Sequence, residues 1–402
     1  MAHKRILVMQ MTRMGDVLQT SPLVRALKQQ NPHAHVTVMI RRMGVAIAEN
    51  NPDIDEIIVY EEDETYLDLR SEDADRLLKA YETTSTYVDR LRNGNFDIAY
   101  NCTHSLCSAM LLKLARIPKV VGAHLSEDWR YIWRGRGPNY FITSVLHRDA
   151  NDLNLCDSFR YFLEDPPVSQ GLVFAVPKAS ALKAQAVLTE HGIAPNDSYI
   201  CFQLGASDKD KRWPESRFAA LALQLSKSLG VKILLVGVKE EAVLGTEFER
   251  HAPGLAVHLF GKTSIPELAE ILRSARVLVT NDTGTMHIAA AVDCPIVLVS
   301  VGYVHFRETG PYGAGHVAIE SCRESAGRSD MRGRDTNGSG VTPEHVTALV
   351  RLITHGVSEA ALDISDFDGV DVFQSFFARD GCLQWYPMFR RAASEADIVR
   401  MA

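Results

Sequence analysis

Residues 276–291 read RVLVTNDTGTMHIAAA and combine three kinds of segment that decide the surrounding fold. The apolar run 276–280 has the length and composition of a buried β-strand. Turn residues, among them Asn281 and Gly284, end this strand, and the small residues that follow predict a helix over 284–292. A strand that passes through a short polar loop into a helix is the repeating unit of a doubly wound α/β sheet.

Similar units occur along the whole chain. In the C-terminal half, other strand-like runs occupy 199–205, 231–237, 256–261 and 295–301. Helical patterns fall near 178–192, 214–229, 239–251, 264–274 and 342–355. The N-terminal half has strand-like runs at 6–11, 35–40, 56–60, 97–101 and 119–123, and helical patterns after residue 16, at 64–91 and at 105–115. This alternation predicts two parallel sheets, each covered by helices on both faces.

A proline-rich stretch separates the two halves. Residues 166–177 are expected to form a linker because they contain Pro166, Pro167, Gly171 and Pro177. We therefore predict one domain over 1–165 and a second over 178–355, each large enough to bury its own core. The remaining tail, 356–402, is rich in aromatic residues, and we expect it to pack back on the N-terminal domain.

The composition is that of a mildly acidic globular protein. The 402 residues are 46% hydrophobic, and 43 Lys and Arg against 50 Asp and Glu give a net charge of −7. These values exclude disorder, collagen and a small disulfide scaffold, and they argue against a general nucleic-acid-binding surface. The seven cysteines include no C-x-x-C pair, so neither a zinc ribbon nor a disulfide framework is expected.

Neither a signal peptide nor a membrane span is predicted. The N-terminal apolar run is short, and the most apolar later stretch, 286–302, is interrupted by His287, Asp293 and Pro295. We expect a cytoplasmic protein that can still dock on a membrane face.

A carboxylate follows the first strand-like run, in the turn Thr12-Arg13-Met14-Gly15-Asp16. Ligands of doubly wound proteins bind at the carboxyl ends of the strands. The turn lacks G-x-G-x-x-G, so the dinucleotide fingerprint is absent and a dehydrogenase is disfavoured. Asp16 is either a helix cap or a carboxylate positioned to accept a proton.

Two loops of the C-terminal half have the composition of an anion site. The segment 203–214, QLGASDKDKRWP, carries Ser207, three cations and the start of a helix. The loop 281–285, NDTGT, begins a helix whose first N–H groups can face an anion, and His287 lies one turn further on. The alternatives are a solvated charged loop and ordinary helix caps.

Two adjacent glutamates, Glu240 and Glu241, open the helix that follows the strand-like run 231–237. Either carboxylate can bind ribose hydroxyls, as a strand-end acid does in dinucleotide folds. Both can equally well complement the helix dipole, and the sequence leaves the choice open.

Taken together, these segments resemble glycosyltransferase family 9, the ADP-heptose:lipopolysaccharide heptosyltransferases. The matching motifs are M-G-D-V-L-Q-T-S-P at 14–22, K-R-W-P at 211–214, G-V-K-E-E at 237–241 and N-D-T-G-T-M-H-I-A-A-A at 281–291. The resemblance implies an α/β GT-B fold, in which two Rossmann-like doubly wound domains face each other across a cleft. It places the acceptor in the N-terminal domain and the nucleotide sugar in the C-terminal domain.

The resemblance also implies roles for individual residues. Asp16 would be the general base, Lys211 would stabilise the departing diphosphate, and Ser207 would assist it. Donor binding would fall to Asp282, Thr283, Gly284 and His287 at the phosphates and sugar, and to Glu240 at the ribose. Arg13 and Gly15 would lie on the acceptor side. No metal and no cofactor are implied beyond the co-substrate ADP-heptose, because cations and helix N-termini can neutralise the leaving diphosphate.

We therefore expect an inverting, metal-independent glycosyltransferase that moves heptose from ADP-heptose to a hydroxyl of a lipopolysaccharide core or another surface glycan. Its partners would be a nucleotide sugar, a glycan or glycolipid acceptor and the inner membrane, at the cytoplasmic face, but no nucleic acid. The alternatives are a different nucleotide sugar, a protein acceptor, a GT-B-like nucleotide-sugar epimerase, or a nucleotide-sugar-binding protein without catalysis.

Some features depart from the family pattern. Gln10 stands where these enzymes often carry a basic residue, and the stretch 61–95 is acidic. The segment 129–136 combines tryptophan and tyrosine with arginine. That combination suits a sugar or an anionic lipid surface as well as an ordinary surface loop.

Overall fold

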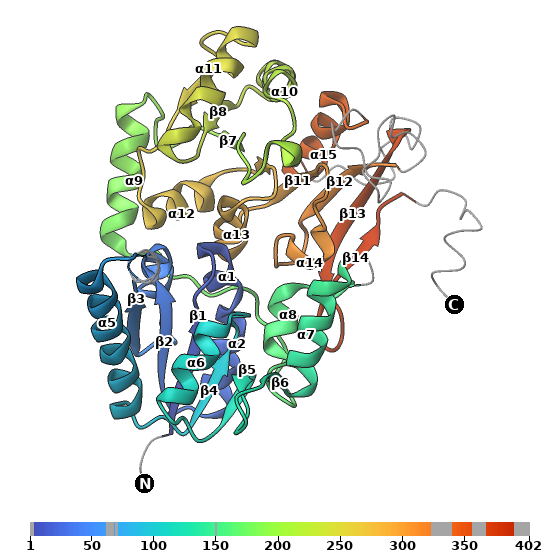
Figure 1. The fold of residues 1–402 in the computed structure, drawn as a ribbon. Coiled ribbons are helices and arrows are strands. Elements are labelled where there is room, and N and C mark those ends of the chain that lie inside the picture. Colours follow the sequence, from blue (N-terminus) through green and yellow to red (C-terminus); the bar gives the residue numbers. More distant parts are fainter. Residues whose placement is uncertain are drawn as a thin grey trace. The chain divides into compact units, whose positions relative to one another are not determined.

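The computed structural model describes residues 4–61, 68, 71–148, 151–322, 340–355 and 367–389. The chain divides into two compact units. The first comprises Met1–Pro177 with Arg379–Cys382, and the second comprises Lys178–Ala378 with Leu383–Ala402. Each unit is built around one β-sheet with helices packed against it (Figure 1).

The first sheet has β1 near its centre. Its strands lie in the order β3 (Glu56–Tyr60), β2 (His35–Arg41), β1 (Arg5–Gln10), β4 (Ile98–Asn101), β5 (Val120–Leu125) and β6 (Tyr131–Arg134). The first five strands are parallel, as expected, whereas the edge strand β6 pairs antiparallel with β5. The order 3-2-1-4-5 is that of a Rossmann-like sheet, in which ligands bind beyond the carboxyl end of the central strand.

The three helical segments predicted for the first unit are present with two differences, and the helices at 42–48, 136–146 and 155–160 were not predicted. The described helices are α1 (Met14–Gln19), α2 (Ser21–Gln30), η1 (Arg42–Gly44), α3 (Val45–Ala48), α5 (Ala74–Asn93), α6 (Leu106–Leu114), α7 (Arg136–Leu146) and α8 (Leu155–Arg160). The single helix expected after residue 16 is two helices, separated at Thr20, with a proline in the first turn of the second. The helix expected over 64–91 begins at Ala74, and part of its predicted start lies outside the described residues.

The second sheet is larger and mixed. Its strands lie in the order β14 (Leu383–Pro387), β13 (Val370–Phe377), β12 (Val317–Ser321), β11 (Ile296–Ser300), β10 (Leu278–Thr280), β7 (Tyr199–Gln203), β8 (Lys232–Leu235) and β9 (Ala256–His258). The strands from β12 to β9 are parallel, and β13 and β14 are antiparallel additions. All the strands predicted for this half are present.

All the helices predicted for the second unit are present, and the short helices at 209–211 and 306–309 were not predicted. The described helices are α9 (Lys178–Glu190), η3 (Lys209–Lys211), α10 (Glu215–Leu229), η4 (Lys239–Glu241), α11 (Ala242–His251), α12 (Ile265–Ser274), α13 (Gly284–Ala291), α14 (Phe306–Thr309) and α15 (Pro343–His355). The central strands β7, β10 and β11 are buried at every residue. A strand without an exposed face requires cover on both sides of the sheet, which explains its continuous apolar sequence.

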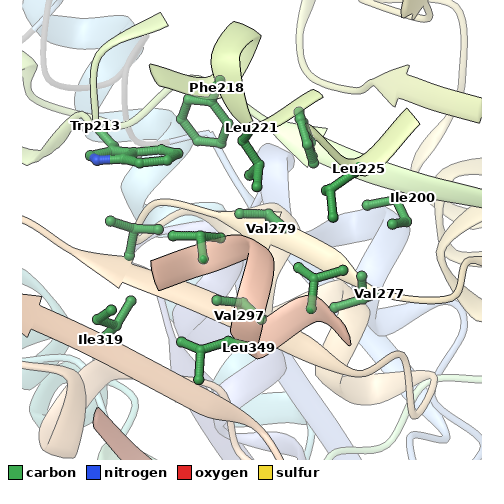
Figure 2. Close-up of a cluster of buried hydrophobic side chains, with 14 of the residues drawn as sticks. Ile200, Trp213, Phe218, Leu221, Leu225, Val277, Val279, Val297, Ile319 and Leu349 are labelled. Atoms are coloured by element: carbon green, nitrogen blue, oxygen red, sulfur yellow. The ribbon is translucent and has the colours of Figure 1, made fainter. Parts of the chain in front are cut away.

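The core of the second unit lies between this sheet and the helices α10 and α15. Figure 2 shows Phe218 and Leu349 from the two helices near Val279 and Val297 of the strands. Trp213 packs edge-to-face against Phe218 at a centroid distance of 4.9 Å. This contact anchors the C-terminal end of the loop that follows β7.

Residues 367–389 contain the hairpin β13–β14, which extends the second sheet. These residues lie within the predicted tail, 356–402, which was expected outside the C-terminal domain. Most of the hairpin instead belongs to the second unit. Its turn, Arg379–Cys382, groups instead with the first unit, where the buried Arg160 donates to the carbonyl of Gly381 (3.0 Å) and to Asp157 (2.5 Å). Residues 356–366 and 390–402 lie outside the described residues.

All seven cysteines are free thiols, and six of them are buried. Burial raises the pKa of Cys102, Cys156 and Cys201 well above the ordinary value. In the part of the chain that the structure describes, no helix is both long and apolar enough to cross a bilayer.

Candidate active site

Four neighbouring parallel strands of the second unit, β11, β10, β7 and β8, end at one edge of the sheet. The loops that follow them, termed the strand-end loops, are 301–305, 281–283, 204–214 and 236–241. Side chains from these loops contact one another, so the sequence-predicted donor residues belong to one region.

Asn281 joins two of the strand-end loops. It is fully buried, its side-chain oxygen accepts from the N–H of Trp213 at 2.9 Å, and its side-chain nitrogen donates to the carbonyl of Leu204 at 2.9 Å. The loop 204–214 forms no regular secondary structure with its neighbours, so the Asn281 amide supplies hydrogen-bond partners for its buried backbone groups. The loop 204–214 therefore has a fixed position next to the start of α13.

Lys211 and Asp282 form an ion pair at this edge. The Nζ–Oδ2 distance is 3.2 Å, and the two side chains are only 12% and 14% exposed. Lys211 Nζ also lies 4.6 Å from the ring centroid of Tyr303, whose hydroxyl donates to Asp208 at 2.9 Å. The backbone N–H of Asp210 and the Tyr303 hydroxyl lower the pKa of Asp208. Lys211, which lies in the loop 204–214, thus contacts side chains from the loops 281–283 and 301–305. The lysine side chain of a solvated loop would make no such contacts.

The two adjacent glutamates differ in position. Glu240 is exposed, whereas the carboxylate of Glu241 accepts from Gln203 Nε2 (3.2 Å) and from the N–H of Val238 (3.0 Å). A Cβ placed on Gly205 would lie 1.7 Å from Glu241 Oε1, so any larger residue would displace this carboxylate from its contacts. Glu241, rather than the predicted Glu240, is therefore the glutamate that lies at the strand ends.

The other predicted donor residues lie around the start of α13. Thr283 is its N-cap and Gly284 its first residue, while His287 is buried within the helix. The first N–H groups of a helix have no intrahelical acceptor and carry the positive end of the helix dipole. Ser207 is exposed in the loop after β7. The start of α13 and the loop after β7 thus present backbone N–H groups and a hydroxyl, the donors that an anion site requires.

Close packing also fixes the loop after β11. Gly302 has a φ of +64°, and a Cβ on it would lie 2.2 Å from the carbonyl oxygen of Asp210. A larger residue would strain the backbone and displace the turn that carries Lys211.

In the first unit, Asp16 follows the central strand β1. It occupies the third position of α1, and its Oδ2 accepts from the N–H of Arg13 at 3.1 Å and from the hydroxyl of Thr12 at 2.7 Å. One oxygen of Asp16, Oδ2, therefore takes part in capping α1, because it accepts from the N–H of the N-cap residue Arg13. Arg13 is exposed and Gly15 is half-buried at the same helix start. Asp16 Oδ1 has no hydrogen-bond partner among the described residues, which leaves this oxygen available for acid–base chemistry.

Sequence reasoning did not single out Thr12, Gln203, Asn281 or Tyr303 as site residues. Gln203 and Tyr303 each lie at or just after the end of a parallel strand, a position that could have marked them. Thr12 lies inside the turn 12–16 and contacts Gln10 and Asp16 nearby in the chain, but its residue type alone indicates no role. Asn281 lies inside the motif 281–291, but its partners Trp213 and Leu204 are 68 and 77 residues away in the chain. Among the described residues, no three His, Cys, Asp or Glu side chains gather as metal ligands.

Two units, each with a Rossmann-like parallel sheet and charged strand-end loops, define the general class of two-domain α/β proteins that bind ligands at the strand ends. Residues 86–334 match the family model described as glycosyltransferase family 9 (heptosyltransferase). The chain belongs to glycosyltransferase family 9 and is a glycosyltransferase.

Sequence relatives agree with this assignment. The chain is 26% identical over 312 residues to lipooligosaccharide heptosyltransferase 2 of Haemophilus ducreyi, covering 74% of this chain and 82% of the relative. It is 25% identical over 307 residues to lipopolysaccharide heptosyltransferase 2 of Salmonella typhimurium, covering 73% and 81%.

Solved structures match the fold over most of the chain. A glycosyltransferase of family 9 from Veillonella parvula has a TM-score of 0.70 at 21% identity, covering 89% of this chain and 98% of the other. The ADP-heptose heptosyltransferase II of Escherichia coli has a TM-score of 0.65 at 22% identity, covering 88% and 99%. The expected GT-B fold is confirmed.

Proposed function

We propose that this enzyme transfers heptose from ADP-heptose to a hydroxyl of a lipopolysaccharide core, in a single inverting displacement without a metal ion. The relatives named above are lipopolysaccharide and lipooligosaccharide heptosyltransferases, and one Escherichia coli heptosyltransferase of similar fold was solved with ADP-2-deoxy-2-fluoro heptose. The observation that carries the proposal is the buried Lys211–Asp282 pair beside the start of α13.

The donor site is proposed on the second unit. As the glycosidic bond breaks, negative charge develops on the departing diphosphate, and Lys211 and the first N–H groups of α13 can neutralise it. Asp282 pairs with Lys211 beside the start of α13, and its carboxylate is the proposed acceptor of hydrogen bonds from the sugar hydroxyls. Glu241 is the proposed ribose ligand because its carboxylate lies at the neighbouring strand end.

The base is proposed on the first unit. Asp16 Oδ1 accepts the proton of the acceptor hydroxyl while the oxygen of that hydroxyl attacks the anomeric carbon. The bond between that carbon and the diphosphate oxygen breaks, and ADP leaves with the electron pair. One proton moves to the enzyme and returns to solvent after product release, so the reaction needs no further co-reactant.

The proposal is tested with ADP-heptose and lipopolysaccharide cores truncated before and after each heptose. We expect the mass of one core to increase by one heptose, at the same rate with and without EDTA. Transfer only from another nucleotide sugar, or only to a protein, would replace the substrate assignment. Isomerisation of the nucleotide sugar without any acceptor would replace transfer by epimerisation.

We also propose that the first unit docks on an anionic membrane, where a lipid-linked acceptor would lie. The α6–β6 surface comprises exposed apolar and aromatic side chains, namely Leu106, Met110, Leu114, Trp129 and Tyr131. The three α6 residues are four apart and share one helix face. Lys113 Nζ lies 5.9 Å from the ring centroid of Trp129. This contact places the turn between β5 and β6, which carries Trp129, beside α6.

Exposed arginines accompany these side chains at positions 130, 134 and 136, and Arg130 forms an exposed ion pair with Asp128 at 2.7 Å. Aromatic and apolar side chains with a basic border are typical of proteins that lie on anionic lipid, and each cation near such a surface contributes about 1 kcal/mol. The surface therefore favours a lipid partner over a soluble glycan alone.

Sedimentation with vesicles tests the docking proposal. We expect binding to phosphatidylglycerol-containing vesicles, weaker binding at high salt, and about tenfold weaker binding for Leu106→Ser/Met110→Ser. The matched control is Leu182→Ser, which removes an exposed leucine from α9. Equal binding by both variants, or no binding by the unmodified enzyme, would refute a lipid role for the α6–β6 surface.

A further inference from the structure

The Asp16 carboxylate belongs to a set of hydrogen bonds that the proposed reaction does not by itself require. Thr12 Oγ1 lies 2.7 Å from Asp16 Oδ2 and 2.7 Å from the side-chain oxygen of Gln10. Gln10 Nε2 lies 3.1 Å from Thr20 Oγ1, and the Thr20 hydroxyl lies 2.7 Å from the main-chain carbonyl of Asp16. Gln10 and Thr20 are 1% and 2% exposed, so water does not replace the contact between these two side chains.

Counting hydrogens shows that these contacts cannot all be satisfied at once. A hydroxyl has one hydrogen, and Thr20 donates its hydrogen to the Asp16 carbonyl, which can only accept. Thr20 therefore accepts from Gln10, and this contact orients the amide nitrogen of Gln10 toward Thr20. The amide oxygen of Gln10 then faces Thr12. The single hydrogen of Thr12 lies between two acceptors, the Gln10 amide oxygen and the Asp16 carboxylate.

The two acceptors differ in strength according to the protonation of Asp16. A carboxylate accepts a hydrogen bond more strongly than a neutral amide or a carboxylic acid does. When Asp16 is ionised, Gln10 and Asp16 share the Thr12 hydrogen. When a proton is bound at Asp16 Oδ1, the acid is the weaker acceptor and the hydrogen passes to Gln10.

We propose that Gln10 is a positioning residue that competes with Asp16 for the hydrogen of Thr12 and so weakens the hydrogen bond that Thr12 donates to the ionised carboxylate. This inference rests on the proposed role of Asp16 as the general base. A hydrogen bond to the charged form of an acid stabilises that form and weakens the base. Gln10 offsets this effect, because its amide oxygen accepts the hydrogen as the acceptor hydroxyl gives up its proton.

The other charged and titratable groups near Asp16 do not compete for the hydrogen of Thr12. Helix α1 packs against α2, η1, α3 and α8. The charged or titratable side chains on these elements are Arg25, Lys28, Arg42, Cys156, Asp157 and Arg160. The five charged members form ion pairs, with Asp53, Asp55, Glu61 and each other. Burial raises the pKa of the Cys156 thiol, to which the Asp16 charge adds, so this thiol stays neutral between pH 5 and about pH 9.

The test compares two variants that change the Thr12 hydrogen in opposite ways. In Gln10→Met the hydrogen belongs to Asp16 alone, so we expect the acid limb of the kcat/KM profile to move to lower pH by about one unit, with a lower plateau. In Thr12→Val the carboxylate loses a donor, so we expect the same limb to move to higher pH. Gln19→Met, which removes another buried glutamine from the same region, is the control and should leave the limb in place.

Opposite shifts of the acid limb in the two variants, with no shift in the control, support the inference. Loss of packing alone would lower the rate but would not move the two limbs in opposite directions. Coincident acid limbs in all variants would overturn the inference. If Gln10→Met fails to fold, Gln10→Leu takes its place, because leucine also lacks the amide oxygen that accepts from Thr12. An acid limb unmoved in Gln10→Leu would then overturn the inference. Transfer retained by Asp16→Asn would instead refute the proposed base itself, so the two failures are distinguishable.

Discussion

At the scale of single residues, the two charged groups of the Lys211–Asp282 pair depend on one another. Both side chains are largely buried, so removal of one leaves an uncompensated charge in a poorly solvated position. The ammonium group is also the cation of the K-R-W-P motif that pairs with the residue just before the start of α13. Its replacement should therefore affect ligand binding more than any exposed lysine of the same loop.

We predict that Lys211→Ala weakens ADP binding by about 10–100-fold, because a charge-assisted contact contributes about 1.5–3 kcal/mol. Titration calorimetry measures this directly. Lys209→Ala removes an exposed lysine two residues away and should bind ADP as the unmodified enzyme does. Equal ADP affinities for the two variants would mean that the loop 204–214 is a solvated charged loop that does not bind the nucleotide.

His316 provides a second prediction at this scale. Complete burial lowers its pKa from 6.5 to about 4, so the unfolded chain binds its proton more readily than the folded chain does. This contribution to stability is complete above pH 6.5 and decreases by about 3 kcal/mol as the pH falls to about 4. Urea unfolding should show this loss in the unmodified protein and not in His316→Gln. Parallel curves for the two proteins between pH 7 and pH 4 would contradict it.

The sequence could identify Asp282 and Lys211 because each lies in a distinctive motif after a strand. It could not distinguish Glu240 from Glu241. Adjacent residues at a helix start point in different directions, and only the contacts with Gln203 and Gly205 show which one faces the strand ends. The role of Thr12 was equally hidden, since it depends on the orientation of the buried Gln10 amide.

At the scale of elements, the strand-end loops of the second unit hold one another through Asn281 rather than through regular secondary structure. We predict that Asn281→Ala lowers the free energy of unfolding by about 2–4 kcal/mol, because the N–H of Trp213 and the carbonyl of Leu204 lose their buried partner. Differential scanning calorimetry should show the loss.

The control for this prediction is Gln185→Ala, which removes an exposed side-chain amide from α9 and should change stability by less than about 0.5 kcal/mol. A similar stability for Asn281→Ala and the control would mean that the loops are held by other contacts.

Most elements could be predicted because their patterns are local. The buried strands have continuous apolar runs, and the helices α10 and α12 have regular apolar faces. The break between α1 and α2 left no clear signal, because Pro22 is compatible with the first turn of one helix or the interior bend of a longer one. The strands β6, β12, β13 and β14 were not predicted, and three of them lie at or next to the edge of a sheet, where pairing depends on contacts distant in sequence.

At the scale of the whole molecule, the division into two units follows from two independent sheets, each with its own order of strands. The linker prolines and the length of each half indicated this division. The hairpin β13–β14 was not foreseen, because its strands have aromatic residues on both faces and no parallel partner nearby in sequence. Its turn, which groups with the first unit through Arg160, joins segments more than 200 residues apart.

The measurement that most directly tests the central claim compares Asp16→Asn with the unmodified enzyme. If Asp16 is the base, the variant binds ADP-heptose with unchanged affinity, because the donor residues belong to the second unit. Its transfer of heptose to the lipopolysaccharide core falls by about 10²–10⁴-fold, since an amide cannot take the proton of the acceptor hydroxyl. Transfer at the unmodified rate, or loss of donor binding together with transfer, would contradict the claim that Asp16 is the base of a heptosyl transfer.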